Sequence, residues 1–289
     1  MRVHVTGGSG FLGGSVVPQL VAAGHEVSAL ARTPAAAERV AALGATAIPG
    51  DLDDPASVDA AFAVSRAEVL VNLASLGFGH APTIVAAAEE AGLHRAVFVS
   101  TTSIFTALQT ATKLVRLAAE DAVMTSGLDW TIIRPTMIYG TPADRNMARL
   151  LRGLRRLAVL PLPGGGRGLQ QPVHVDDLAG AIVAALDRPA TIGRAYDVAG
   201  PEAITLRVVI EEAGGAVDRH PRLVSVPLRP MVAVMRVYEA VAPSPRLTSE
   251  QIARLAEDKA VDISPARADL GFDPRPFRAG ISAEAALLR

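Results

Sequence analysis

The chain of 289 residues has a formal net charge of −1 and contains no cysteine. The near-neutral charge favours neither nucleic acid nor an anionic membrane surface as a partner, and the lack of cysteine excludes disulfides, thiolate catalysis and Cys-ligated metals. No apolar run reaches the roughly 18–20 residues that cross a bilayer, and no signal-peptide pattern precedes the first expected strand. We therefore expect a cytoplasmic protein without membrane insertion, whose partner is a small-molecule substrate.

Short runs rich in Val, Ile and Leu alternate with Ala-rich amphipathic stretches through about residue 135. Strands are predicted near residues 2–5, 26–30, 46–49, 68–72, 96–100 and 130–134, with helices near 11–23, 35–43, 55–63, 81–91 and 110–126. This alternation predicts parallel strands joined by right-handed crossovers, which is a doubly wound α/β fold with a parallel Rossmann sheet. A left-handed glycine cap is expected just past four of the helices, at Gly24, Gly44, Gly92 and Gly127.

The first turn of this pattern carries a binding motif. The strand at 2–5 is followed by Thr6-Gly7-Gly8-Ser9-Gly10-Phe11-Leu12-Gly13 and then by an apolar, helix-like run. Glycine lets the backbone turn sharply and approach a pyrophosphate closely, and the following helix aims free N–H groups at the phosphates. The motif therefore predicts dinucleotide binding through Gly7, Ser9, Gly10, Phe11, Leu12 and Gly13. The alternative is a glycine-rich turn without a ligand.

Arg32 ends the second predicted strand, where NAD-preferring sites usually carry an acidic residue that binds the ribose hydroxyls. A guanidinium can bind the 2′-phosphate of NADP as a forked pair, and no carboxylate at that position repels the phosphate. We therefore expect NADP(H) in preference to NAD(H), the alternative being a solvated arginine. Asp51 and Leu52 follow the third strand, and Asp51 is placed to accept a hydrogen bond from the adenine or to act as a turn residue. Ala74, after the fourth strand, is expected to line the cofactor groove.

The pattern loosens after residue 135, and the segment from Pro161 to Gly168 is predicted as a loop. Strands are predicted near residues 171–175, 194–199 and 222–226, with helices near 144–157, 177–187, 205–213, 229–241 and 248–256. We expect residues 1–140 to form the dinucleotide-binding domain. Residues 141–289 are expected to form a smaller, mixed α/β substrate-binding lobe, interleaved with that domain as one structural unit.

Further motifs follow the glycine turn in order: Gly50-Asp-Leu52, Asn72-Leu-Ala74, Phe98-Val-Ser-Thr-Thr-Ser103, Arg134-Pro-Thr-Met-Ile-Tyr-Gly140, Gln171-Pro-Val-His-Val-Asp-Asp177 and Leu270-Gly-Phe-Asp-Pro274. With them the chain resembles the extended short-chain dehydrogenase/reductase superfamily. It is most similar to the atypical members, which are NAD-dependent epimerase/dehydratase-like or NAD(P)H-binding proteins such as the complex I 39-kDa subunit. The resemblance covers nearly the whole chain.

This resemblance implies a catalytic Ser or Thr after the fifth strand and a Tyr four residues before a Lys. Thr102 matches the first position, and Lys113 matches the Lys that holds the nicotinamide ribose. Gln109 stands where the Tyr is expected, and its amide donates a hydrogen bond but cannot release a proton at accessible pH. Atypical members of the superfamily also lack the Tyr. The resemblance further implies that the backbone at Pro135 contacts the nicotinamide.

Five residues are candidates for contact with the substrate: His80, Ser103, Tyr139, Arg145 and Arg167. His80 faces the substrate or is an exposed loop histidine. Tyr139 donates a proton or packs in the interior. Arg145 belongs to the segment that covers the substrate or begins a basic helix. Arg167 resembles the superfamily's arginine for a substrate phosphate or carboxylate.

His174 is expected to be structural, because it lies inside a strand just before Asp176, a predicted helix N-cap. The six scattered histidines form no metal-binding spacing.

Three functions remain open on these residues. An NADP(H)-dependent ketone or carbonyl reductase is favoured, because hydride transfer depends mostly on proximity and Thr102 can polarise a carbonyl. A non-catalytic NADP(H)-binding sensor or assembly protein is the second. A sugar-nucleotide epimerase or dehydratase is the third, and the missing Tyr counts against it, because that chemistry needs a base. By analogy with the superfamily, a homodimer through the helices at 81–91 and 110–126 is also expected.

Overall fold

The computed structural model describes residues 1–108, 110–242 and 248–288, which fall into two compact units. Unit 1 comprises Met1–Pro135, Val175–Val198 and Asp262–Asp273, and unit 2 comprises Thr136–His174, Ala199–Val261 and Pro274–Arg289. The chain therefore leaves unit 1 three times and returns to it twice. The observed division lies at Pro135, five residues before the predicted boundary, and two later segments come back to the dinucleotide-binding unit.

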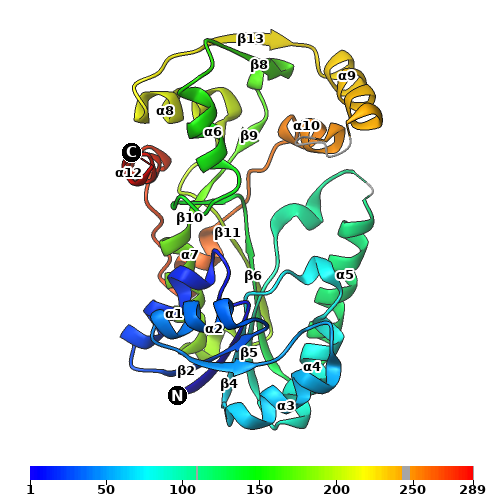
Figure 1. Cartoon of the computed structure of the whole chain (residues 1–289), viewed down its shortest axis with the longest axis vertical. Coiled ribbons are helices and arrows are strands. Elements are labelled where there is room, and N and C mark those ends of the chain that lie inside the picture. Colours follow the sequence, from blue (N-terminus) through cyan, green and yellow to red (C-terminus); the bar gives the residue numbers. More distant parts are fainter. Residues whose placement is uncertain (109, 243–247, 289) are drawn as a thin grey trace. The chain divides into compact units, whose positions relative to one another are not determined.

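Unit 1 is built on a seven-stranded sheet with the order β11-β6-β5-β4-β1-β2-β3 (Figure 1). Its strands are β1 (Arg2–Thr6), β2 (Glu26–Ala31), β3 (Thr46–Pro49), β4 (Val69–Asn72), β5 (Arg95–Val99), β6 (Asp129–Pro135) and β11 (Arg194–Val198). All neighbours pair in parallel, and Val5 of β1 lies between Ala29 of β2 and Val71 of β4. Parallel strands covered on both faces are apolar throughout, as Val3 and Val5 are here. The predicted doubly wound Rossmann fold is confirmed.

Helices cover both faces of this sheet (Figure 1). They are α1 (Gly13–Ala22), α2 (Pro34–Ala42), α3 (Pro55–Ser65), α4 (Ala81–Glu90), α5 (Ala111–Met124), α7 (Val175–Leu186) and α11 (Ser264–Leu270), with short 3₁₀ turns η1 (Leu76–Phe78), η2 (Thr102–Phe105) and η4 (Pro189–Thr191). Helix α1 packs on α7, while α3 packs on α4 and α4 on α5. Phe62, Ile84, Phe98, Val123 and Ile132 are buried together between α3, α4, α5 and the sheet.

The predicted glycine caps are correct at three of four positions. Gly24, Gly44 and Gly92 have φ values of +83°, +92° and +74°. Gly127 is the exception, because α5 ends at Met124 with Thr125 as its right-handed cap residue, so Gly127 lies beyond the cap. Its N–H donates instead to the Glu89 carboxylate at 2.7 Å.

Unit 2 contains three two-stranded sheets, β10-β7, β12-β9 and β13-β8. Its strands are β7 (Ile138–Tyr139), β8 (Val159–Pro163), β9 (Leu169–Gln170), β10 (Val173–His174), β12 (Ile204–Thr205) and β13 (Arg222–Val226). Its helices are α6 (Met147–Leu154), α8 (Leu206–Ala216), α9 (Leu228–Val241), α10 (Ser249–Leu255) and α12 (Phe277–Leu287), with a 3₁₀ turn η3 (Gly164–Gly166). Tyr139, Leu151, Leu162, Val209 and Phe277 share its core.

Strand β8 corrects the predicted loop at Pro161–Gly168, because Val159–Pro163 pairs in parallel with β13. Proline is tolerated where a strand has a neighbour on one side only, which is the situation in a two-stranded sheet. The predicted N-cap at Asp176 is also corrected. Helix α7 begins one residue earlier, and Asp176 lies in its first turn, where its carboxylate accepts a hydrogen bond from the Ser15 hydroxyl at 2.8 Å. Over the described ranges, we find no helix with the length and apolar character needed to span a membrane.

Candidate functional site

The backbone of the glycine turn after β1 is packed too closely to admit a side chain at Gly7 or Gly13. Gly7 has a φ of +74°, and a Cβ there would lie 2.7 Å from the backbone nitrogen of Ala74. A Cβ on Gly13 would lie 2.0 Å from the carbonyl oxygen of Gly8. The N–H of Gly10 donates to the Gly7 carbonyl at 3.0 Å, which closes the turn. The turn therefore brings the ends of β1 and β4 and the start of α1 into backbone contact.

The amino terminus of α1 fits a phosphate group. Leu12 occupies the N-cap without a side-chain cap hydrogen bond, and the first turn contains no acidic residue. The positive end of the helix dipole therefore faces the turn without a competing side chain, while the N–H groups of Gly14 and Ser15 donate to the carbonyls of Gly10 and Leu12 at 3.1 Å. Leu12 is buried, so its contribution to a cofactor would come from its backbone, while Ser9 and Phe11 are half-buried. The arrangement suits the pyrophosphate of a dinucleotide.

Arg32 lies between two carboxylates that follow β3. Its guanidinium is 3.8 Å from Asp51 and 3.7 Å from Asp53. No carboxylate stands beside Arg32 at the end of β2, but the turn after β3 supplies two. All three side chains are well exposed, so these ion pairs are weak and rearrange easily. The guanidinium can therefore turn towards an added anion at small cost.

His80 lies in the same cluster, because its Nε2 is 3.6 Å from the other oxygen of Asp53. The structure thus groups His80, a predicted substrate residue, with Arg32, a predicted cofactor residue. The Asp51 carboxylate accepts a hydrogen bond from the N–H of Asp53 at 3.1 Å. Asp51 therefore acts as a turn residue, which was one of its two predicted alternatives. Leu52 packs against the apolar cluster of Leu30, Ile48 and Ala61.

The residues expected near the nicotinamide follow β5. Thr101 caps η2, and the Thr102 hydroxyl donates to the carbonyl of Pro135 at 3.3 Å. Pro135 is the last residue of β6, the neighbour of β5, so two adjacent strand ends meet at this hydrogen bond. The hydroxyl of Ser103 accepts from the Arg116 guanidinium at 3.0 Å, which ties Ser103 to α5.

Lys113 lies in the first turn of α5, and Thr110 caps that helix. The Lys113 ammonium donates to the Thr106 carbonyl at 2.6 Å. This bond ties α5 to Thr106, the residue after η2, and Gln109 lies outside the described residues. That Gln109 stands in place of the expected Tyr is therefore inferred from the sequence alone.

A buried ion pair that the sequence analysis missed fixes β6 beside this loop. The Arg134 guanidinium donates to both carboxylate oxygens of Glu120 at 2.6–3.1 Å, and Glu120 is 2% exposed. The Phe105 ring lies 5.5 Å from the guanidinium carbon. Burial raises the pKa of Asp197 in the neighbouring strand, and Arg134 opposes that rise. The alternation of strands and helices carries no signal for such a pair.

Two of the predicted substrate residues in unit 2, Arg145 and Arg167, are exposed, while Tyr139 is completely buried. The Tyr139 ring packs edge-on against His174 and Phe277, and a Cβ on Gly280 would lie 2.2 Å from its hydroxyl oxygen. Tyr139 therefore takes the packing role, and its predicted contact with substrate is corrected. His174 is buried and structural, as predicted.

Two further carboxylates in unit 2 were not anticipated. Buried Asp144 accepts three backbone N–H bonds at the start of α6, from Asn146, Met147 and Ala148. Glu284 of α12 accepts the N–H of Gly140 at 2.9 Å. Burial, reinforced by the nearby Asp144, raises the pKa of Glu284 to about 7.

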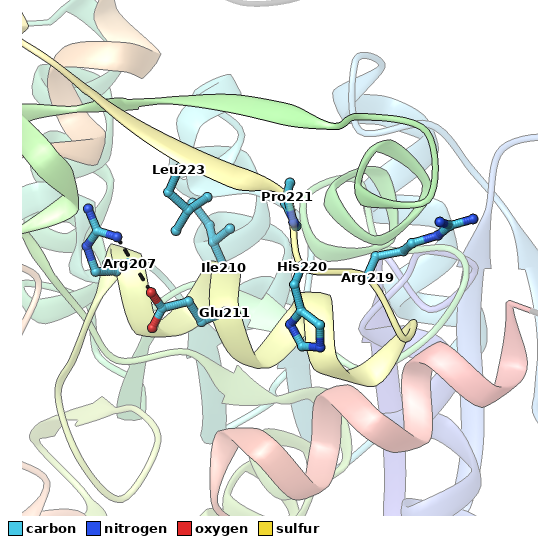
Figure 2. Close-up of a pocket in the computed structure, with 7 residues that line it drawn as sticks. All are labelled: Arg207, Ile210, Glu211, Arg219, His220, Pro221 and Leu223. Carbon is cyan, nitrogen blue, oxygen red and sulfur yellow. Dashed lines mark ion pairs between the residues drawn. The ribbon is translucent and has the colours of Figure 1, made fainter.

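Unit 2 also contains an open pocket of about 330 Å³ (Figure 2), between α8 and β13. Its lining residues are Arg207, Ile210, Glu211, Arg219, His220, Pro221 and Leu223. Arg207 and Glu211 pair at 3.6 Å, so their charges largely cancel, and the Arg219 side chain extends away from the others in Figure 2. This pocket contains none of the predicted site residues. Among the described residues, no cluster of His, Asp and Glu is suited to hold a metal ion.

A family model described as NAD(P)H-binding matches residues 7–189. The chain belongs to this NAD(P)H-binding family. The family assignment agrees with the glycine turn and the uncapped α1 terminus, and it confirms a nicotinamide cofactor.

Several relatives of this family member have names that refer to electron transfer or reduction. The subunit 9 of the NADH dehydrogenase 1 alpha subcomplex of Arabidopsis thaliana is 31% identical over 77% of this chain and 60% of its own length. The NAD(P)H azoreductase of Xenophilus azovorans is 29% identical over 78% of this chain and 77% of its own. The 2-alkyl-3-oxoalkanoate reductase of Stenotrophomonas maltophilia is 27% identical, with 95% of both chains covered. Together they support an NAD(P)-dependent oxidoreductase, and the resemblance to the complex I subunit group is confirmed.

Solved structures confirm the fold of the family member. The UDP-glucose 4-epimerase of Thermotoga maritima superposes with a TM-score of 0.78 at 16% identity, covering 100% of this chain and 99% of that one. The UDP-glucose 4-epimerase of Thermus thermophilus, solved with NAD, gives 0.75 at 21% identity with the same coverage.

Proposed function

We propose that this chain is an NADP(H)-dependent reductase of ketones or related carbonyl compounds that works without the catalytic tyrosine usual in the short-chain dehydrogenase/reductase superfamily. The observation that carries the proposal is the pair of donors after β5. Thr102 and Lys113 belong to the same unit as the glycine turn, and each donates to a backbone carbonyl, Pro135 or Thr106. The hydrogen bonds of these two donors can switch from the backbone carbonyls to a ligand oxygen. The exchange leaves no buried charge unpaired.

When bound, NADPH supplies the hydride. The Thr102 hydroxyl donates a hydrogen bond to the substrate carbonyl oxygen and so stabilises the negative charge that develops there. The Lys113 ammonium binds the ribose hydroxyls and holds a proton beside them. The glycine turn and the α1 terminus fix the cofactor, so proximity and orientation supply most of the rate.

The preference for NADP(H) rests on Arg32. Its guanidinium is 65% exposed, and both carboxylate contacts are longer than hydrogen bonds, at 3.7 and 3.8 Å. A 2′-phosphate offers a shorter, charge-assisted bidentate partner than either carboxylate. Asp51 and Asp53 reduce this advantage by repelling the phosphate, so we expect a preference of moderate size.

Ketones are the proposed substrate class because of the relatives' names. The relative covered over 95% of both chains is named for reduction of an oxoalkanoate, and a ketoreductase of Stigmatella aurantiaca is 28% identical over 65% of both chains. The second candidate function is binding without turnover, in a sensor or assembly protein. It is favoured by the complex I relative and by Gln109.

The test is oxidation of NADPH by the purified chain over a panel of ketones. Thr102→Val is expected to lower kcat by about 100-fold with little change in the NADPH dissociation constant, because the hydroxyl acts on the substrate oxygen. Thr125→Val, which removes a hydroxyl at the far end of α5, is the matched control. Tight NADPH binding with no ketone reduced would favour the second candidate.

The homodimer expected from the resemblance stays a prediction. Leu114 and Leu117 of α5 are 62% and 40% exposed, which is a large apolar exposure for neighbouring residues on one helix. Analytical ultracentrifugation of the wild type and of Leu114→Glu tests it. A wild-type monomer at micromolar concentration would contradict it.

A further inference from the structure

His80, one of the predicted substrate residues, lies close to residues expected to bind the adenosine half of the cofactor. Its Nε2 is 3.6 Å from one carboxylate oxygen of Asp53, and the other oxygen of Asp53 is 3.7 Å from the Arg32 guanidinium. One carboxylate therefore joins the imidazole to the arginine on which the proposed preference for NADP(H) depends. Under the proposed function, Asp53 only repels the 2′-phosphate, and His80 has no role.

The packing of two helices explains why Asp53 and His80 meet. Helix α3 packs on α4 in unit 1. His80 is the N-cap residue of α4, and Asp53 directly precedes Asp54, the N-cap residue of α3. The two side chains therefore belong to neighbouring connections that lead into these helices, and the positive ends of both helices favour a carboxylate at this place.

The three side chains differ in their exposure. The His80 side chain is 19% exposed, whereas those of Arg32 and Asp53 are 65% and 69% exposed. The His80 ring also lies beside the Phe78 ring, with 6.2 Å between the centroids. The imidazole is therefore fixed by its surroundings, while the Asp53 carboxylate is free to turn towards Arg32 or away from it.

Asp51, the other carboxylate near Arg32, is held more firmly. It accepts the N–H of Asp53 at 3.1 Å, and its own N–H donates to the Ser57 hydroxyl at 2.8 Å. Within the described ranges, the Asp53 carboxylate makes no hydrogen bond, and its ion pairs are those with Arg32 and His80. Asp53 is therefore the carboxylate of this cluster that can change its partner.

A bound 2′-phosphate makes the position of Asp53 important. The phosphate carries a charge of about −1.5 to −2 and pairs with the same guanidinium that faces Asp53. Like charges repel less as they separate, so a carboxylate that moves away from Arg32 disfavours the phosphate less. The imidazole offers Asp53 a second partner, and its Nε2 can donate in the charged ring and in one neutral tautomer.

We propose that His80 sets the preference for NADP(H) by drawing Asp53 away from Arg32, which leaves the guanidinium to the 2′-phosphate. Asp53 limits the preference, and His80 is a positioning residue that acts through this carboxylate. NAD(H) has no 2′-phosphate, so Arg32 and Asp53 stay paired when it binds. The inference rests on the proposed preference for NADP(H).

The test is a double-mutant cycle on the full chain, read as the NADH dissociation constant divided by that of NADPH. Both constants come from fluorescence titration at about pH 8, where the 2′-phosphate is fully ionised. Asp53→Asn is expected to raise this ratio about fivefold, because it removes a negative charge beside the phosphate. His80→Leu is expected to lower it about threefold, because Asp53 returns to Arg32. The double variant is expected to have the ratio of Asp53→Asn, because His80 acts only through the carboxylate.

Asp54→Asn is the matched control. It removes the same charge from the next residue, whose exposed side chain makes no cap hydrogen bond to α3. Its ratio is expected to stay within about twofold of the wild type. A purely structural role for His80 predicts a different pattern, because His80→Leu would then weaken NADPH and NADH alike.

The inference is overturned if His80→Leu leaves the ratio unchanged, or lowers it as much in the Asp53→Asn background as in the wild type. It is also overturned if Asp53→Asn and Asp54→Asn raise the ratio equally. Both aspartate variants change exposed side chains, so this arm stands even if His80→Leu does not fold.

Arg32→Asp in the same titrations separates this inference from the proposed function. A ratio that falls in Arg32→Asp but not in His80→Leu contradicts the role of His80 alone. A wild-type ratio near one that Arg32→Asp leaves unchanged contradicts the proposed preference for NADP(H) and the role of His80 with it.

Discussion

The unit 1 sheet has an amino edge, where its strands begin, and a carboxyl edge, where they end. The two edges differ in how their polar groups are used. At the amino edge, the guanidinium of Arg95 donates to acceptors on its own strand β5, on the neighbouring strand β6, on α7 and on η4: the carbonyls of Ala96, Asp129 and Ala185 and the hydroxyls of Thr131 and Thr191. At the carboxyl edge, the buried hydroxyl oxygen of Ser100 has no hydrogen-bond partner among the described residues, and Gly7 leaves no room for a Cβ. One edge closes the fold, and the other leaves polar groups and bare backbone for a ligand.

The largest effect is expected at the carboxyl edge. Gly13→Ala places a methyl group 2.0 Å from the Gly8 carbonyl, so the turn must open and the α1 terminus must move. We expect NADPH affinity to fall by about 1,000-fold, or about 4 kcal/mol, measured by fluorescence titration. Gly14→Ala is the matched control, because a Cβ there meets no atom within 4 Å. Equal NADPH affinity of the two variants would remove the structural basis of the cofactor site.

The amino edge is expected to respond in stability instead. Arg95→Met leaves the carbonyls of Ala96 and Ala185 and the hydroxyls of Thr131 and Thr191, all in part-buried contacts, with fewer donors. Urea unfolding should show a loss of about 3 kcal/mol, with the NADPH dissociation constant of the folded variant unchanged. A clear loss of NADPH affinity at full stability would show that the two edges are not separate in function.

His4 lies in β1, between the two edges of the sheet. It makes the free energy of unfolding depend on pH. It is packed edge-on against Phe62, and burial lowers its pKa from 6.5 to about 4. The unfolded chain binds this proton first, so its contribution to stability is fully present above about pH 6.5 and is lost as the pH falls through 4. We expect the contribution of His4 to the free energy of unfolding to drop by about 3 kcal/mol over that window, while Glu284, whose pKa is raised to about 7, acts in the opposite direction.

The measurement is urea unfolding at several pH values for the wild type and His4→Leu. The difference in the free energy of unfolding between the wild type and the leucine variant is expected to change by most of that amount between about pH 6.5 and about pH 4. The exposed residue His220 provides the control His220→Gln, which should keep the wild-type slope. An unchanged slope in His4→Leu would contradict the assignment.

The smallest effect is expected at Arg32, because its ion pairs are exposed. Arg32→Asp should shift the ratio of NADPH to NADH affinity by about tenfold towards NADH, or about 1.4 kcal/mol. Arg39→Asp makes the same charge change on α2, where the Arg39 side chain donates to a helix carbonyl. If Arg39→Asp shifts the ratio as much as Arg32→Asp, the preference reflects general charge and the proposed contact with the 2′-phosphate is wrong.

The sequence predicts unit 1 closely, because parallel strands and amphipathic helices leave strong periodic patterns and the glycine turn is local. The same reasoning misses β8, since Pro161 and Pro163 are typical of loops and only pairing with β13 makes them a strand. It also assigns His80 and Arg32 to different parts of the site, although both lie within 4 Å of Asp53. The three residues belong to the segments that follow β2, β3 and β4. Contacts between residues distant in sequence, such as Arg134 with Glu120, have no periodic signature.

The central claim is that NADPH bound at the carboxyl edge of unit 1 transfers a hydride to the carbonyl carbon of a ketone. The most direct measurement uses NADPH deuterated at the transferable position, with mass spectrometry of the alcohol formed from each ketone in the panel. The account predicts one deuterium on the new alcohol carbon, and loss of that product in Thr102→Val at unchanged NADPH affinity. NADPH that binds tightly while no ketone acquires deuterium would contradict it.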